Sequence, residues 1–161
     1  MEKFTDNFPL AQEILTRLVK LGKTLSTAES CTGGRIAATL TQVSGASDYF
    51  QGGLVAYQDH LKVRYLEVRQ KDIDAYDVVS QSVVEQMVRG ACRLFHSDYA
   101  IASTGYAGTG ANGISSGTIW IGWGSTHEVH SICLTQDEGR ELNTAHATTR
   151  ALEYFLRFIS K

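Results

Sequence analysis

The segment Thr24–Leu40, TLSTAESCTGGRIAATL, is the part of the sequence that decides the predicted fold. Residues 24–28 form a short run bounded by small residues, which favours a strand. Ser30–Gly34 follows as a turn, and residues 35–40 are typical of a helix that grows out of it. A strand that ends in a glycine-containing turn before a helix is characteristic of α/β proteins, where ligands bind at the carboxyl ends of the strands.

Helical and strand patterns alternate on both sides of this segment. Leu10–Leu21 has apolar residues at helical spacing, and Gly22 follows as its C-cap. Further along, the patterns predict strands over 48–57, 99–103, 118–123 and 128–134, and helices over 60–66, from Ser80 and over 141–158. This order predicts a three-layer α/β/α sandwich with a largely parallel, partly mixed sheet. We expect one domain over 1–161, with its core at about 10–159.

Several local signals refine this prediction. Ser82 with Glu85 three residues later resembles a capping box at the start of the helix that Ser80 opens. One apolar face of that helix is predicted from its helical spacing: Val84, Met87, Val88, Ala91, Leu94 and Phe95. Gly52–Gly53 predicts a bulge or a close backbone approach in the strand 48–57. Gly124–Ser125 predicts a hairpin between the last two strands.

Composition excludes several classes of function. The chain has 161 residues, a hydrophobic fraction of 43% and a net charge of −2, so neither nucleic acid nor an anionic membrane is expected as its main partner. The three cysteines follow no disulfide or zinc spacing, and the five histidines follow no metal-binding spacing. The N-terminus lacks the apolar region of a signal peptide, and there is no run of 18 apolar residues. We therefore expect a cytoplasmic protein without a metal.

Two loops combine a strand end with small residues. In Thr27–Gly34 the glycines let the backbone approach a ligand, and the following helix N-terminus favours an oxyanion or a phosphate. An N-cap serine with a tight turn is the alternative. The second loop, Thr104–Gly113, is neither a Walker loop nor a dinucleotide fingerprint. It is either a flexible surface loop or a second ligand contact.

Several segments of the sequence, among them these two loops, resemble the CinA C-terminal-domain family, also called the PncC family. The specific match is TAESCTGG at Thr27–Gly34. Support comes from the order and spacing of further blocks: GGLVAYQDHLK at Gly52–Lys62, Val79–Ser80, STGYAGTGANG with GTIWIGW, and Gly139–Glu141. The resemblance covers roughly residues 10 to 159.

The resemblance implies a metal-free and cofactor-free amidohydrolase that converts nicotinamide mononucleotide to nicotinate mononucleotide and ammonia. It implies Ser30 as the nucleophile, Lys62 as its base and Tyr57 as a hydroxyl that relays or orients. Arg140 is the expected phosphate contact. Further substrate contacts are expected from the two loops, namely Thr32, Gly33, Gly34, Thr104 and Gly105. The ligand is a pyridine nucleotide, and we expect a homo-oligomer.

The chemistry of these residue types supports the implied roles. A serine hydroxyl attacks an amide only if a base removes its proton, and a lysine with a lowered pKa can be that base. Backbone N–H groups after Ser30 are candidate donors to the oxyanion. The alternatives are a solvated Lys62, a packed Tyr57 and an Arg140 paired with a local acid. Cys31 offers a thiol, but no histidine lies near it in sequence.

The sequence departs from the family pattern mainly around the substrate. Tyr106 stands where isoleucine is usual, and Thr109 stands where proline is usual. Ile114–Ser116 replaces a lysine–proline pair, Asp59 replaces an asparagine, and Asn143 replaces a second arginine. These departures predict weak binding of nicotinamide mononucleotide, which an arginine at Asn143 is expected to improve. The alternatives are a catalytically silent ligand-binding or regulatory paralogue and an enzyme for another small amide.

Overall fold

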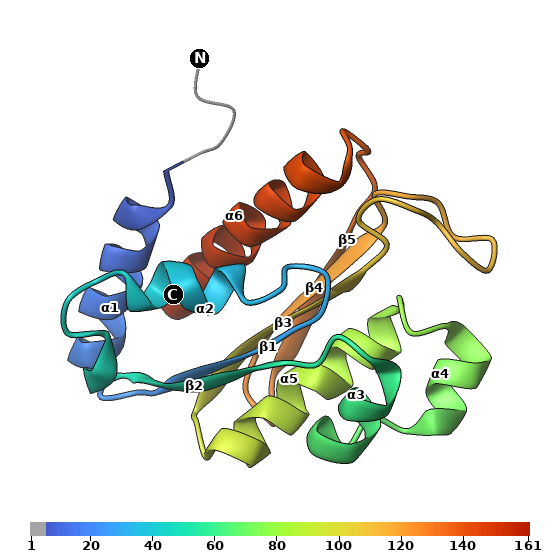
Figure 1. Cartoon of the computed structure of the whole chain (residues 1–161). Helices are drawn as coiled ribbons and strands as arrows, with labels where there is room; N and C mark the ends of the chain where they lie inside the picture. Colours follow the sequence, from blue (N-terminus) through green and yellow to red (C-terminus); the bar gives the residue numbers. More distant parts are fainter. Residues whose placement is uncertain (1–5) are drawn as a thin grey trace.

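The computed structural model describes residues 6–161, in which five strands form one sheet between two layers of helices (Figure 1). The strands, in the order in which they lie across the sheet, are β2 (Phe50–Val55), β1 (Leu25–Glu29), β3 (Tyr99–Gly105), β4 (Ile119–Gly124) and β5 (Val129–Leu134). β1 pairs in parallel with β2 and β3, whereas β4 is antiparallel to β3 and β5. The mixed α/β sandwich predicted from the sequence is confirmed.

The helices divide between the two faces of the sheet (Figure 1). On one face lie α1 (Phe8–Leu21), α2 (Arg35–Thr41) and α6 (Arg140–Ile159). On the other lie α3 (Asp59–Leu66), α4 (Gln70–Tyr76) and α5 (Gln81–Phe95), and a short 3-10 turn, η1 (Ala46–Asp48), precedes β2. Each face has its own apolar core, so β1, which lies between β2 and β3, is buried along its whole length. No helix within residues 6–161 is both long and apolar enough to cross a bilayer.

Most local predictions agree with these elements. Gly22 ends α1 in the left-handed conformation, and the Ser125 N–H donates to the Glu128 carbonyl in the predicted hairpin. The register of β2 against β1 shifts beside Gly52, as the predicted bulge requires.

Two details of the helix α5 differ from the sequence prediction. The capping box was placed two residues too late, because the N-cap is Ser80, whose hydroxyl accepts from the Val83 N–H at 3.3 Å. Ser82 lies within the helix and accepts from the Gln86 side chain instead. Leu94, predicted on the buried face, is 39% exposed.

Candidate active site

The candidate nucleophile lies at the carboxyl end of the interior strand β1. Ser30 directly follows β1, and its N–H donates to the Ser103 carbonyl of β3 at 3.0 Å. The next two residues of β3, Thr104 and Gly105, therefore reach the same edge of the sheet. Ser30 is 8% exposed, at the bottom of a small cavity. This is the edge at which ligands bind in α/β sheets.

A buried glutamate holds the turn after Ser30. The Glu29 carboxylate accepts from the N–H groups of Ile36 and Ala37, at 2.9 and 3.0 Å, and from the Thr32 hydroxyl at 2.6 Å. The Ile36 and Ala37 N–H groups at the start of α2 are thus already bonded to a carboxylate. That the turn before them binds an oxyanion or a phosphate stays a prediction. Gly33 and Gly34, both with positive φ, complete the turn.

The candidate base comes from α3, on the opposite face of the sheet from α2. Lys62 is 1% exposed, and its Nζ donates to the Ala56 carbonyl at 2.8 Å and to Ser30 Oγ at 3.2 Å. The Asp59 carboxylate, one helical turn earlier, lies 3.8 Å from Nζ. Burial lowers the pKa of Lys62, and Asp59 opposes that shift. Sequence spacing alone favoured a solvated lysine, whereas the structure places it in the interior.

The close approach of α3 to α5 depends on a glycine. A Cβ at Gly90 in α5 would lie 1.9 Å from the Leu66 carbonyl oxygen, so any other residue would push the end of α3 away. Since Lys62 lies one turn before Leu66, this contact helps to set the position of the lysine.

The structure brings most of the predicted site residues together around one cavity of about 200 Å³. Its lining includes Ser30, Cys31, Tyr57, Asp59, Lys62, Val78, Val79, Thr104, Gly105, Tyr106, Ala107, Thr109 and Arg140. We call it the serine cavity. Thr32, Gly33 and Gly34 do not line it. Their contacts build the turn instead.

Two predicted residues lie at the rim of the serine cavity. Tyr57, between β2 and α3, is 56% exposed, and its hydroxyl makes no hydrogen bond to Ser30 or Lys62. Arg140 begins α6, and its side chain lies across the backbone of Gly108. It forms no ion pair within residues 6–161, so the alternative in which it pairs with a local acid has no support.

Cys31 is a weaker candidate nucleophile than Ser30. Its thiol is 8% exposed, and burial raises its pKa to about 12. Because the thiolate is the reactive form, a thiol that stays protonated at neutral pH is a poor nucleophile. Among residues 6–161, moreover, no cluster of three or more His, Cys, Asp or Glu side chains has the arrangement of a metal site.

Several residues that shape the site were not predicted. Asn143 is buried and fixes the glycine-rich loop, because its amide donates to the Ala107 carbonyl and to Asp137, each at 2.8 Å. A second hydrogen bond holds this loop, because the Tyr106 hydroxyl donates to Asp77 Oδ2 at 2.8 Å. The contacts of Asn143 with Ala107 and of Tyr106 with Asp77 join residues 36 and 29 positions apart, so no local pattern identifies them. Asp59 lies three residues before Lys62 and just before the predicted helix 60–66, so its closeness to the lysine could have been read from the sequence.

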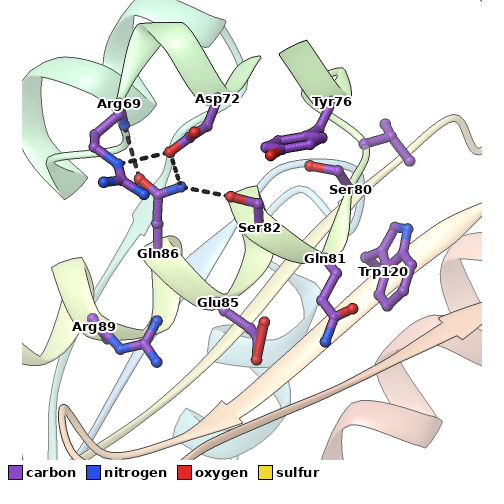
Figure 2. Close-up of a pocket in the computed structure, with 11 residues that line it drawn as sticks. Arg69, Asp72, Tyr76, Ser80, Gln81, Ser82, Glu85, Gln86, Arg89 and Trp120 are labelled. Carbon is purple, nitrogen blue, oxygen red and sulfur yellow. Dashed lines mark hydrogen bonds and ion pairs between the residues drawn. The ribbon is translucent and has the colours of Figure 1, made fainter. Parts of the chain in front are cut away.

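A larger hollow of about 710 Å³ lies beside α5 (Figure 2). Of the residues that line it, only Val79 also lines the serine cavity. Four of the hollow's polar side chains, those of Arg69, Asp72, Ser82 and Gln86, are bonded to one another. Asp72 accepts from Arg69 at 2.7 Å and from Gln86 at 3.0 Å, and Gln86 also donates to Ser82 (Figure 2). The hollow has no nucleophile–base pair, so the smaller serine cavity is the candidate active site.

Comparison with known proteins agrees with this architecture. Residues 7–159 match the CinA C-terminal domain. The chain belongs to this family. It is 38% identical over 155 residues to a CinA-like protein of Shewanella pealeana, an alignment that covers 94% of this chain and 37% of that protein. A CinA-like protein of Flavobacterium psychrophilum is 39% identical over 140 residues, which is 86% of this chain and 34% of that protein.

Solved structures in the CinA family have the same fold. The competence damage-inducible protein A (ComA) of Klebsiella pneumoniae superimposes with a TM-score of 0.93 at 30% identity, covering 97% of this chain and 98% of that one. The competence/damage inducible protein CihA of Agrobacterium tumefaciens gives 0.91 at 31% identity, covering all of both chains. By contrast, this chain spans only 34–37% of the length of the curated CinA-like relatives described above.

Proposed function

We propose that this chain is an amidohydrolase that deamidates nicotinamide mononucleotide, with Ser30 as nucleophile and Lys62 as base. The observation that carries the proposal is the buried Lys62 Nζ at 3.2 Å from Ser30 Oγ. This distance is at the upper end of the range in which a base takes a proton directly. Burial lowers the pKa of Lys62, which increases the share of neutral amine that can act as the base.

The proposed reaction has two halves. Neutral Lys62 accepts the Ser30 proton while Oγ attacks the carboxamide carbon, and the resulting ammonium returns that proton to the departing amino group as ammonia. The ester that joins Ser30 Oγ to the nicotinoyl group is then attacked by a water that Lys62 deprotonates, and the Lys62 ammonium returns that proton to Ser30 Oγ as nicotinate mononucleotide leaves. Within residues 6–161 the N–H groups of Cys31 and Thr32 donate to no acceptor, which makes them the candidate oxyanion donors. No cofactor is required.

Charge determines how the substrate lies in this proposal. Within residues 6–161 Arg140, at the rim, has no ion-pair partner, and its fork suits a phosphate. It also begins α6, where the helix dipole favours an anion. The phosphate is therefore assigned to the Arg140 side and the carboxamide to Ser30. Thr104 and Gly105 of the cavity lining contact the substrate between its carboxamide and its phosphate. Tyr57, at the mouth of the serine cavity, orients the pyridine ring or relays a proton.

The test is ammonia release from nicotinamide mononucleotide by purified protein, with nicotinate mononucleotide as the second product. Ser30→Ala is the control that should release none. Saturable binding of the nucleotide without ammonia would contradict the proposal and favour the silent ligand-binding paralogue. Release of ammonia only from other amides would show that the site is an amidase with a different substrate. Homo-oligomeric assembly and a cytoplasmic location stay predictions.

A further inference from the structure

A second cavity of about 670 Å³ lies next to the serine cavity. Three of the residues that line it are carboxylates, Asp59, Asp74 and Asp77, and we call it the acidic cavity. The two cavities share the side chains Asp59, Val78 and Tyr106. These residues therefore form the partition between them, and Tyr106 is the largest of the three.

The Tyr106 ring is fastened at its outer end. Its hydroxyl donates to Asp77 Oδ2 at 2.8 Å, and the same carboxylate accepts from the Val79 N–H and the Asn112 amide, each at 2.9 Å. Asp77 thus ties the segment before α5 to two points of the glycine-rich loop. Burial and the neighbouring carboxylate raise the pKa of Tyr106 to about 12, so its hydroxyl keeps the proton that it donates.

The backbone of Asp77 supports the same interpretation. It has φ 77° and ψ 156°, a region that is essentially restricted to glycine. Such a conformation persists in another residue only where the surroundings enforce it, and here three hydrogen bonds to the carboxylate do so. Strained residues of this kind cluster at ligand sites.

The size and charge of the two cavities indicate that the partition limits the space for the carboxamide end of the substrate. At about 200 Å³ the serine cavity is smaller than the roughly 300–1,000 Å³ of pockets that enclose a drug-sized ligand, so it holds only one end of a mononucleotide. The acidic cavity repels a phosphate, whereas Arg140 at the opposite side attracts one. Without the Tyr106 ring the two cavities would join, and the carboxamide end would have a wider space.

We infer that Tyr106, fixed by Asp77, is a specificity-determining residue that restricts the serine cavity to a single-ring carboxamide. The inference rests on the proposed amidase function and adds which residues select the acyl group. Tyr106 acts as a wall, and Asp77 is the positioning residue that holds it.

The experiment compares nicotinamide mononucleotide with an analogue in which quinoline-3-carboxamide, a fused double ring, replaces nicotinamide. Wild type should prefer the single ring in kcat/KM, and Tyr106→Ala should reduce this preference at least tenfold. Tyr106→Phe keeps the ring but loses the Asp77 bond, so it should raise KM more than it lowers kcat. Tyr65→Ala on α3, an exposed tyrosine outside both cavities, is the matched control and should retain the wild-type preference.

Calorimetric binding of the same two compounds separates this inference from the proposed function, because it is measured in the Ser30→Ala background, where no turnover occurs. Adding Tyr106→Ala should reduce the difference in affinity between the compounds at least tenfold. If wild type releases no ammonia but the difference in affinity changes in this way, the proposed amidase function is refuted and the role of Tyr106 as a specificity-determining residue stands. An unchanged difference, or no binding of either compound to either variant, would overturn the inference.

Asp77→Gly tests the positioning role, since glycine accepts the backbone conformation but lacks the carboxylate. Amide hydrogen exchange should become faster over residues 106–114, and the change in KM should match that of Tyr106→Phe. Unchanged exchange and unchanged KM would show that Asp77 does not hold the wall.

Discussion

Replacement of Asp59 by asparagine should shift the pH dependence of catalysis toward acid. The proposed base is neutral Lys62, so kcat/KM rises as pH increases through the pKa of that lysine. Asp59 stabilises the ammonium form, and Asp59→Asn therefore lowers the pKa of Lys62. The acid limb of the pH profile moves to lower pH, and at a pH on that limb the variant is more active than wild type.

The magnitude follows from the distance between the two charges. Asp59 Oδ1 lies 3.8 Å from Lys62 Nζ. A pair at 4 Å interacts by about 1 kcal/mol in bulk water and by about 4 kcal/mol at an effective dielectric constant of 20. Because Asp59 is 57% exposed, the lower value applies. One pKa unit corresponds to about 1.36 kcal/mol, so the expected shift is roughly 0.7 unit.

The assay is kcat/KM for ammonia release between pH 5 and 10 for wild type, Asp59→Asn and Asp74→Asn. The last variant removes an equal charge from α4, outside the serine cavity, and should shift the profile much less because of solvent screening. An unchanged profile in Asp59→Asn, or a shift toward higher pH, would refute the assignment of Lys62 as the base.

Three further predictions concern the surroundings of the nucleophile. Burial lowers the pKa of Lys62 in the folded state below its ordinary value of 10.5, so between the folded and the unfolded pKa the folded state binds fewer protons than the unfolded state. The free energy of unfolding of wild type should therefore rise relative to that of Lys62→Met as pH increases toward 10.5, which denaturant titrations measure. Arg140→Ala should raise KM for nicotinamide mononucleotide by roughly 10- to 150-fold, from a charge-assisted bond of about 1.5–3 kcal/mol, while nicotinamide riboside, which has no phosphate, should be unaffected. Asn143→Arg should lower the melting temperature and the activity, because it breaks the hydrogen bond to the Ala107 carbonyl. A gain in kcat/KM would contradict this and support the expectation, drawn from the family pattern, that an arginine here improves substrate binding.

The sequence predicted the architecture well because the residues that begin and end its helices and strands are adjacent to those elements in the chain. The strand before Ser30, the turn with Gly33 and Gly34 and the helix after it follow from adjacent residue types, and so does the hairpin at Gly124. The pairing of Ser30 with Lys62 came from the family resemblance. Spacing alone gave no reason to bury a lysine from α3.

Contacts between distant segments account for what the sequence did not predict. The Glu29 carboxylate accepts from the Ile36 and Ala37 N–H groups of α2, which removes two of the donors that the predicted oxyanion or phosphate site at that helix could use. The Ser82–Glu85 pattern was present, but the helix began at an earlier serine. Asp77 and Tyr106 meet across 29 positions, and only the fold brings them together.

The central claim is that Ser30 and Lys62 act as one nucleophile–base unit, and a double-mutant cycle on ammonia release from nicotinamide mononucleotide tests it most directly. Ser30→Ala and Lys62→Met should each lower kcat by roughly 10²–10⁴-fold or more, and the double variant should be little worse than either, because residues that act together are strongly non-additive. Lys71→Met, at an exposed lysine of α4, should retain wild-type activity. Near-wild-type kcat in either Ser30→Ala or Lys62→Met, or losses that multiply in the double variant, would contradict the account.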